Sequence, residues 1–254
     1  MDWAAQRRFV ILSIIGAVIA AFLIILAITV FYKAPSCSDG VQNQGEAGID
    51  CGGPCPYLCT DQEQAPIVLF TKVIPNGTGR TDIIASIENR NAAAAAKAVP
   101  YTLTLYGVGQ VILQQETGTL DLPPAATVPV FIPNVATGNQ TVTAAFLSIA
   151  PSLPQWYTFS GNPRTVPVVT NTTLSGSSGA PRIDATLSNS SSTTLNDVVV
   201  IVFVHNDKGD VIAASQTVVP TIPPQGEATA TFTWGGAFSG IPATIEVFPI
   251  IPLP

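Results

Sequence analysis

The sequence predicts one membrane-spanning helix near the N-terminus, followed by an all-β region that folds as two β-sandwich domains in tandem. Three observations support this fold class. Residues 9–32 carry no charged side chain. The remaining chain is rich in Val, Ile, Thr, Pro, Gly, Asn and Ser, the residues typical of strands and turns. The region after residue 65 also resembles itself at an offset of 100 residues.

The uncharged run FVILSIIGAVIAAFLIILAITVFY occupies residues 9–32. As a helix rising about 1.5 Å per residue it spans about 36 Å, more than a hydrocarbon core of about 30 Å. A signal peptide has an apolar core of about 7–15 residues and a small-x-small cleavage site, which ITVFYKAPS does not offer. A buried core helix normally has a polar face, which this run lacks. We therefore predict an uncleaved anchor, with a cleaved secretion signal as the alternative.

Basic residues indicate the orientation of this anchor. Arg7 and Arg8 lie directly before the apolar run, whereas Lys33 alone follows it. Lys and Arg near a span favour the cytoplasmic side. We therefore expect residues 1–8 inside the cell and residues 34–254 outside it, so that the protein is a single-pass protein of the cell membrane with an extracytoplasmic ectodomain.

The charge balance limits the classes of partner. The chain has 16 acidic and 10 basic residues and a formal net charge of −6. Proteins that bind nucleic acid need basic patches to neutralise phosphates. The composition therefore argues against a nucleic-acid partner.

Four cysteines lie close together in the segment CSDGVQNQGEAGIDCGGPCPYLC. An even number of cysteines outside the membrane, in a short Gly- and Pro-rich segment, favours two disulfides. A zinc site with four thiolate ligands and four free thiols are the alternatives, and the spacing does not select a pairing. The four residues are Cys37, Cys51, Cys55 and Cys59.

The same segment contains oxygen-bearing side chains at close intervals, and no Lys or Arg occurs between Lys33 and Lys72. Ca²⁺ prefers oxygen ligands in loops of this kind, although the EF-hand pattern is absent. The alternative is a solvated acidic loop that forms turns. The candidate calcium ligands are Asp39, Asn43, Glu46 and Asp50.

The run D-G-x-x-N-x-x-E-x-x-x-D-C-G-G-x-C, from Asp39 to Cys55, resembles a short cysteine motif of bacterial surface and exported proteins. The resemblance implies a cell-envelope setting and no activity. The family usually closes with C-P-x-C, whereas Pro56, Tyr57 and Leu58 separate Cys55 from Cys59 here.

The repeat at an offset of 100 residues is visible in matched positions such as Asn89 with Asn189 and Gly109 with Gly209. Each copy alternates short strands and turns over about 100 residues, the size of an immunoglobulin-like sandwich. The segment NDKGD (206–210) predicts a hairpin turn. The expected parts are a cytoplasmic segment 1–8, a transmembrane helix 9–32, a cysteine-rich stalk 33–64, a sandwich 65–152, a linker 153–165 and a sandwich 166–254.

The first copy also resembles the FxLYD-type bacterial domains, whose pattern L-Y-x-x-x-G-x-V-I is partly kept by Leu105, Tyr106, Gly109, Val111 and Ile112. The match is looser in the second copy, around Val204 and His205. These domains serve as spacers and binding modules of the cell envelope, and the resemblance assigns no catalytic residue.

Residues that usually perform chemistry are scarce. His205 is the only histidine, and no G-x-S-x-G or phosphate-binding glycine loop occurs. His205 is expected to be an exposed residue beside a turn. The motif N-x-[ST] occurs at Asn76, Asn139, Asn171 and Asn189, which are candidate surface glycosylation sites if the cell glycosylates asparagine.

The sequence thus predicts a non-enzymatic, membrane-anchored protein of the cell envelope that presents two β-sandwich modules for adhesion or envelope assembly. Its expected partner is another envelope protein or a cell-surface partner, and no cofactor is expected apart from Ca²⁺. One alternative is an anchored glycan- or solute-binding subunit, served by Trp156, Tyr157 and Trp234. An anchored hydrolase is the other.

Overall fold

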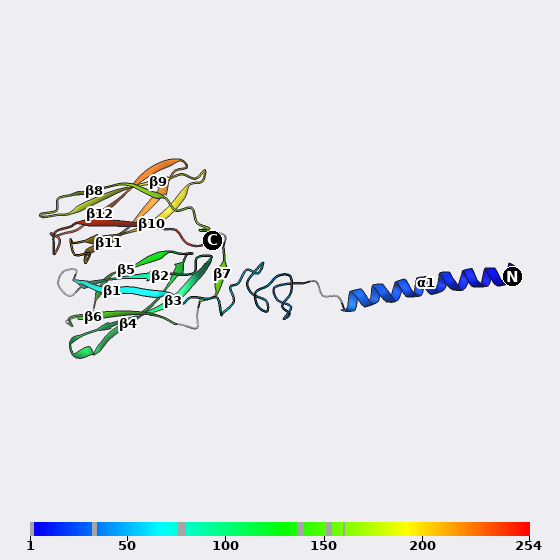
Figure 1. Cartoon of the computed structure of the whole chain (residues 1–254). Helices are drawn as coiled ribbons and strands as arrows, with labels where there is room; N and C mark the ends of the chain where they lie inside the picture. The colour runs from blue at the N-terminus through cyan, green and yellow to red at the C-terminus, as the bar shows by residue number, and fades with distance from the viewer. Residues whose placement is uncertain (1–2, 32–34, 76–79, 137–139, 151–153, 160) are drawn as a thin grey trace. The chain divides into compact units, whose positions relative to one another are not determined.

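A computed structural model describes residues 3–31, 35–75, 80–136, 140–150, 154–159 and 161–254. The described chain divides into two compact units, residues 1–55 and 56–254. The first contains helix α1 (Trp3–Phe31) and the cysteine-rich loop, and the second contains all the strands (Figure 1).

Helix α1 begins six residues before the predicted apolar run, at Trp3, so that it includes Arg7 and Arg8. The Arg7 guanidinium lies 4.4 Å from the centre of the Trp3 ring. The helix is apolar on all sides and long enough to cross a membrane, which the continuous run of Ile, Leu, Val, Ala and Phe explains. Tyr32 and Lys33, which the prediction placed at the outer end of the span, lie outside the described residues.

The strands confirm an all-β fold after the helix. They are β1 (Ile67–Pro75), β2 (Arg80–Glu88), β3 (Ala94–Tyr106), β4 (Ile112–Leu122), β5 (Thr127–Ala136), β6 (Ala144–Ile149), β7 (Trp156–Thr158), β8 (Val168–Ser175), β9 (Arg182–Asn189), β10 (Leu195–His205), β11 (Val211–Ile222), β12 (Gly226–Thr233) and β13 (Thr244–Ile250); a short 3₁₀ turn, η1 (Val108–Gln110), joins β3 to β4.

The first seven strands form two antiparallel sheets that pack face to face. One sheet has the order β1-β2-β5, and the other has the order β4-β3-β6 with β7 beside β3. Alternate residues of both sheets point inward and make one buried core, in which Ile83 and Ile87 face Leu103, Leu105 and other apolar side chains. This two-layer arrangement is visible in Figure 1.

The last six strands repeat the same topology, with the orders β8-β9-β12 and β11-β10-β13. The core comes from the equivalent inward positions, including Ile183, Leu187, Val200 and Val202. The two halves of the repeat are therefore two copies of one structural unit. Their assignment to the immunoglobulin-like class stays a prediction.

The predicted linker 153–165 contains a strand, β7, that belongs to the first sandwich. β7 pairs with the start of β3, and Trp156 is 2% exposed within the first core. Three residue pairs with β3 place β7 in the first sheet, so Trp156 packs inside the first core and not between the two sandwiches. The segment 56–58, predicted as part of the stalk, also joins this sandwich: Leu58 N donates to Trp156 O at 3.0 Å, and Thr158 N donates to Pro56 O at 2.8 Å.

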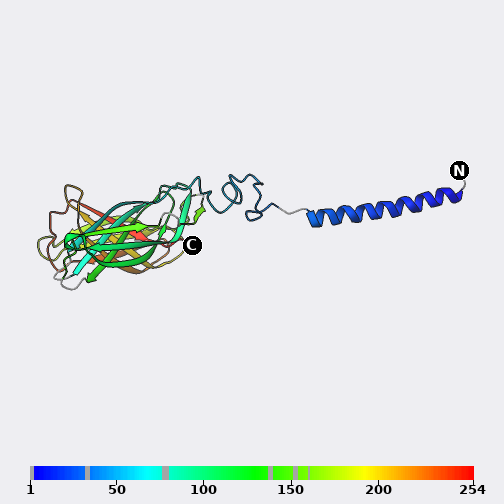
Figure 2. The ribbon, with the colours of Figure 1, turned by 90° about the horizontal axis from the view of Figure 1, so that it is seen from below.

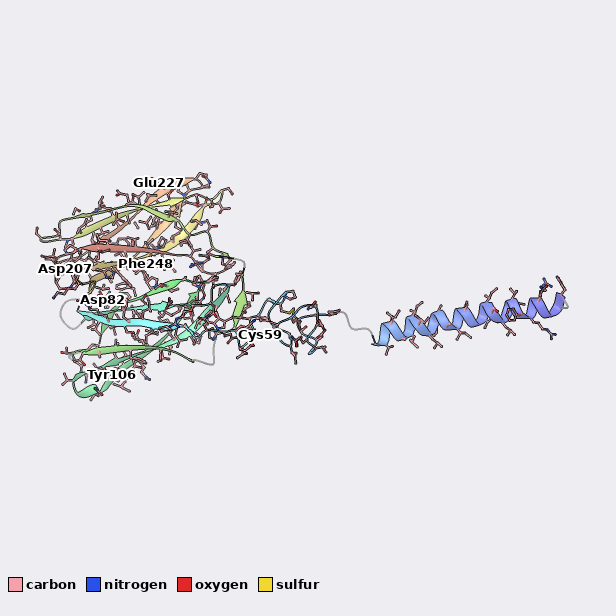
Figure 3. The ribbon with its side chains drawn as sticks, viewed as in Figure 1. Cys59, Asp82, Tyr106, Asp207, Glu227 and Phe248 are labelled. Atoms are coloured by element: carbon pink, nitrogen blue, oxygen red, sulfur yellow. A yellow bond between two sulfur atoms is a disulfide. The ribbon has the colours of Figure 1, made fainter. Side chains whose placement is uncertain are left out.

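The two sandwiches pack on each other through the outer faces of two sheets. Ile84 on β2 and Phe203 on β10 are buried in a third apolar cluster, against which the partly buried Phe70, Phe131 and Phe248 pack. Phe248 is labelled in Figure 3. The rings of Phe203 and Phe248 lie 5.4 Å apart. This contact explains why β10 is apolar on both faces: one face lines its own core, and the other covers the first sandwich. Figure 2 shows the sandwiches from a second direction.

The repeat shows that the contact is specific to these two faces. The positions that match Ile84 and Phe131 in the second copy are Asp184 and Thr231, which face outward and bond to each other at 2.6 Å. The outer face of the β8-β9-β12 sheet is therefore polar. The apolar contact is therefore made by the outer faces of the β1-β2-β5 and β11-β10-β13 sheets.

Candidate functional site

The cysteine-rich loop was the strongest candidate site in the sequence, and its cysteines are all oxidised. Cys37 and Cys55 form a disulfide with Cα atoms 5.6 Å apart, and Cys51 and Cys59 are disulfide-bonded as well. The structure thus agrees with the expected two disulfides. A four-thiolate zinc site is incompatible with this state, because zinc needs deprotonated thiols.

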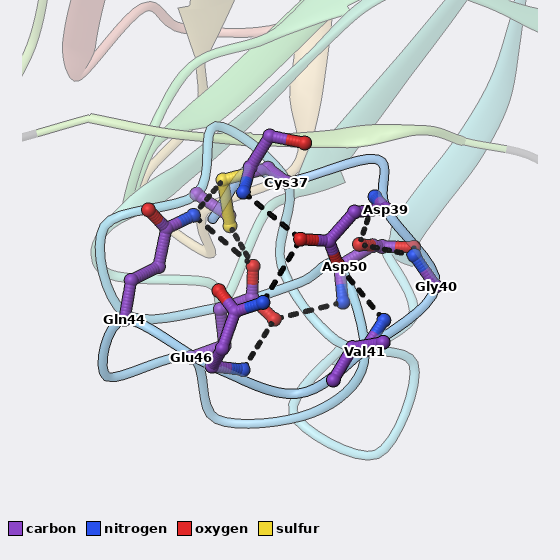
Figure 4. The surroundings of a disulfide bond; sticks show 10 residues. Cys37, Asp39, Gly40, Val41, Gln44, Glu46 and Asp50 are labelled. Carbon is purple, nitrogen blue, oxygen red and sulfur yellow. Dashed lines mark hydrogen bonds between the residues drawn. A yellow bond between two sulfur atoms is a disulfide. The ribbon is translucent and has the colours of Figure 1, made fainter. Parts of the chain in front are cut away.

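The carboxylates of this loop accept hydrogen bonds from backbone N–H groups (Figure 4). Asp50 accepts from Asp39 N at 3.0 Å and from Gly40 N at 2.9 Å. Asp39 accepts from Val41 N at 2.9 Å and from the Asn43 side chain at 2.9 Å. These bonds stabilise a loop that has little apolar surface to bury, because each satisfies an amide that no secondary structure pairs.

Glu46 is the buried member of the loop, with 6% of its surface exposed. One carboxylate oxygen accepts from Asp50 N at 3.1 Å, and the other lies 3.1 Å from the Cys55 Sγ. The sulfur belongs to a disulfide and carries no hydrogen, so the second contact is not a hydrogen bond. The sequence does not reveal this contact, because it depends on how the loop folds back.

The four candidate calcium ligands lie in one loop but do not converge. Among the residues that the structure describes, Asp39, Glu46 and Asp50 do not bring carboxylate oxygens within 4.8 Å of one another. The group that does meet this distance consists of Cys37, Glu46 and Cys55, and two of its atoms are disulfide sulfurs. The Asn43 Oδ1 is buried and accepts no hydrogen bond. The arrangement therefore favours carboxylates that brace the loop, and calcium binding stays a prediction.

His205 lies at the end of β10, beside the predicted turn, and is more buried than expected. Its side chain is 15% exposed, and the two ring nitrogens lie 3.1 Å from Gly209 O and 3.2 Å from a Glu246 carboxylate oxygen. Both nitrogens are thus engaged within the second sandwich. The turn itself has the predicted form, since Gly209 has a φ of 80°.

Two of the candidate glycosylation positions can be placed. Asn171 is exposed on β8, whereas Asn189 is 1% exposed and hydrogen-bonded inside the second sandwich. Burial makes Asn189 unsuitable as a surface acceptor. Asn76 and Asn139 lie outside the described residues.

A cleft of about 740 Å³ lies where the two sandwiches meet. Tyr101, Phe131 and Phe248 contribute aromatic surface to its walls, and Arg164 and Gln216 contribute polar groups. Burial lowers the pKa of Arg164, and the nearby Asp121 carboxylate opposes this shift. Arg164 Nη1 donates to Ile251 O at 3.0 Å, and Leu253 N donates to Asp121 at 2.7 Å. The cleft thus has the size of a small-ligand site, and sequence reasoning did not identify it.

The three aromatic residues proposed for ligand binding do not form one surface. Trp156 is buried in the first core, and Tyr157 packs against Tyr57 with ring centres 5.3 Å apart. Trp234 packs edge-on against Phe238 and donates to Ala214 O at 3.3 Å. The aromatic side chains that line the cleft are different ones.

No protein-family model and no curated protein matches this sequence. Among solved structures, the chain is similar to a transglutaminase of red sea bream, with 10% identity, a TM-score of 0.25, and coverage of 73% of this chain and 29% of that one. It is also similar to a β-glucuronidase of glycoside hydrolase family 2, with 11% identity, a TM-score of 0.21, and coverage of 80% and 25%. This chain therefore spans less than a third of the length of either protein, and the TM-scores are too low to support an inference about fold or function.

Proposed function

We propose that this chain is a non-enzymatic, membrane-anchored protein of the cell envelope that presents two β-sandwiches outside the membrane, for adhesion or for assembly with another envelope protein. The observation that carries the proposal is the apolar contact between the sandwiches, centred on Ile84 and Phe203. It joins two copies of one unit into a fixed pair, as expected of a display or binding module. A single active site would not need such a duplication.

The chemistry of the described residues supports a binding role over catalysis. His205 has both ring nitrogens engaged, and the disulfide sulfurs beside Glu46 offer no thiolate nucleophile. The apolar helix supports membrane anchoring, and the disulfides support an oxidising compartment such as the outside of the cell.

Protease protection tests the location in intact cells that express the protein with a tag at each end. We expect added protease to remove the C-terminal tag and leave a short membrane-bound stub with the N-terminal tag. Permeabilised cells, in which both tags are accessible, provide the control. Protection of the C-terminal tag in intact cells would contradict the proposed orientation, and release of the C-terminal tag into the medium without added protease would indicate a cleaved signal.

A second candidate function is that of a glycan- or solute-binding subunit, favoured by the cleft with Tyr101, Arg164 and Phe248. Sedimentation of the purified full chain with isolated cell-wall polysaccharide separates the two functions. Binding that is lost in Arg164→Ala, and kept in a variant of the exposed Arg90, supports the subunit function. Absence of binding supports adhesion or assembly through another surface.

A further inference from the structure

The strand β6 forms one edge of the β4-β3-β6 sheet in the first sandwich. In the described part of the chain, β6 pairs with β3 on one side and with no strand on the other. β1, the edge strand of the facing sheet, runs beside β6 without forming a ladder with it. The unpaired side of β6 therefore presents backbone N–H and C=O groups that an added strand can bond.

Two hollows adjoin this edge. A hollow of about 480 Å³ lies between β1 and β6 and is lined by Val68, Phe70 and Leu147 among others. A second, of about 630 Å³, lies between the start of β6 and the turn that follows β3, near Tyr106 and Val108. Phe146 lines both hollows and is 59% exposed. We refer to these two hollows together as the groove.

The groove is apolar and uncharged. No Lys, Arg, Asp, Glu or His is among the described residues that line either hollow. Val108, Val111 and Ile112, at the tip of the β3–β4 hairpin, are 79%, 59% and 56% exposed. Phe70 connects the groove to the apolar contact between the sandwiches, where its ring lies 6.4 Å from that of Phe203. Exposed apolar side chains gathered in one place are typical of interaction sites.

The second sandwich provides an internal comparison. By strand register and turn hydrogen bonds, the positions that match Val108 and Phe146 hold Asp207 and Glu246, and Val211, which matches Ile112, is 5% exposed. Glu246 contacts His205 and leaves no apolar side chain at this place. The two copies share a topology, so the groove belongs to the sequence of the first copy and not to the fold.

We propose that the unpaired edge of β6 binds an extended segment of a protein partner as an added strand of the β4-β3-β6 sheet. Backbone hydrogen bonds to β6 hold the segment, and alternate apolar side chains enter the two hollows beside Phe146. The segment is uncharged where it pairs, because the groove offers no group to neutralise a charge. An anionic lipid surface is disfavoured for the same reason, since the groove has no basic side chain. The proposal rests on the proposed binding function and assigns it to one edge.

Photocrosslinking in intact cells tests this assignment with the full chain. p-Benzoylphenylalanine replaces Phe146 and, as a matched control, Val168, which is 60% exposed on the edge strand β8 of the second sandwich. Mass spectrometry then identifies the crosslinked segment. We expect position 146, and not 168, to capture an uncharged segment with alternating apolar residues. A synthetic peptide of that segment should bind the detergent-solubilised full chain and slow amide hydrogen exchange across residues 144–149.

Charge substitutions test the same contact in the absence of crosslinker. Phe146→Glu introduces the residue found in the second copy and should weaken peptide binding about tenfold or more, whereas Val168→Glu should change it by less than about twofold. Circular dichroism of both variants controls for folding. Capture of lipid, of a charged or helical segment, or of a second copy of this chain at position 146 overturns the proposal.

The outcomes also separate this proposal from the proposed function. Crosslinks to an envelope protein from position 168 but not from 146 keep the binding function and overturn the assignment to β6. Absence of crosslinks at both positions overturns the assignment, and turnover of a substrate by the purified protein overturns the proposed function.

Discussion

Asn89 and Asn189 lie 100 residues apart and make the same hydrogen bonds in the two sandwiches. The Asn89 side-chain amide donates to Ala94 O at 2.9 Å, to Pro123 O at 2.7 Å and, at 3.4 Å, to Leu122 O. The Asn189 amide donates to Thr193 O at 2.8 Å, to Pro223 O at 3.1 Å and, at 3.4 Å, to Ile222 O. Each Oδ1 accepts from the backbone N–H two residues later.

Loss of either asparagine should destabilise the sandwich that contains it. Both are 1% exposed, so Asn89→Ala or Asn189→Ala leaves buried carbonyl oxygens without a donor, at a cost of about 1–3 kcal/mol each. Urea unfolding of the full chain measures this change. Asn171→Ala, at an exposed position, is the control and should differ from wild type by less than about 0.5 kcal/mol. Equal midpoints for all three variants would contradict a structural role for the buried pair.

The Glu46 carboxylate should protect the Cys37–Cys55 disulfide from reduction. A thiolate reductant places negative charge on the departing sulfur, and the carboxylate oxygen 3.1 Å from Cys55 Sγ opposes that charge. Glu46→Gln keeps the shape and removes the charge, so reduction by dithiothreitol should become roughly threefold to tenfold faster. Alkylation at timed intervals followed by mass spectrometry measures the rate.

Glu63→Gln is the matched control for Glu46→Gln, since it removes one acidic charge from the same region of the sequence. Its reduction rate should stay within about twofold of wild type. An equal acceleration in both variants would show that net charge, and not the contact with Cys55, controls the rate.

The sequence predicted those features that depend on local pattern. The uncharged run predicted the helix, and alternating residues with turn residues between them predicted strands in the second sandwich. The match of Asn89 with Asn189 indicated the repeat. In the second sandwich, NDKGD forms the predicted hairpin turn. These features could be predicted because they depend on the local sequence and not on contacts between distant residues.

The features that were missed depend on partners far along the chain. Trp156 was assigned to a linker because prolines surround it, but its strand finds backbone partners on β3. Ile84 of the first sandwich covers the apolar outer face of β10, and the sequence did not reveal this contact. In the cysteine-rich loop, the residue types indicated oxygen ligands for a cation. Only the folded loop shows that backbone amides donate hydrogen bonds to many of these oxygens.

The ion pair on the outer face of the second sandwich should make stability depend on pH. Two hydrogen bonds from Arg182 and one from Thr231 hold the pKa of Asp184 below its ordinary value of 3.8. Because the pKa of Asp184 is lower in the folded state than in the unfolded state, the ion pair stabilises the fold at pH values above the unfolded pKa. This stabilisation is lost as the pH falls through the folded pKa. Asp184→Asn should therefore lose less stability than wild type between about pH 5 and about pH 2. Urea midpoints across this range measure the difference, and parallel curves would contradict it.

The outer face of β10 should make the second sandwich depend on the first. Ile201, Phe203 and Phe248 are covered by the first sandwich, so residues 166–254 expressed alone expose an apolar face and should self-associate. By the alternation of side chains, the matching positions on β3 are Thr102 and Thr104. Ile201→Thr combined with Phe203→Thr should therefore make the isolated segment monomeric, as gel filtration with light scattering measures.

In the full chain, the same double substitution should uncouple the two sandwiches. Truncation of each large buried side chain costs about 2–5 kcal/mol, and the loss falls on the contact that joins the two units. We expect calorimetry to show one cooperative transition for the wild type and two for the variant. Val198→Thr, which alters the core of the second sandwich on the other face of β10, is the control and should lower the transition temperature without dividing it. Two transitions in the wild type, or a monomeric wild-type segment 166–254, would show that the sandwiches are independent and that the apolar face of β10 does not join them.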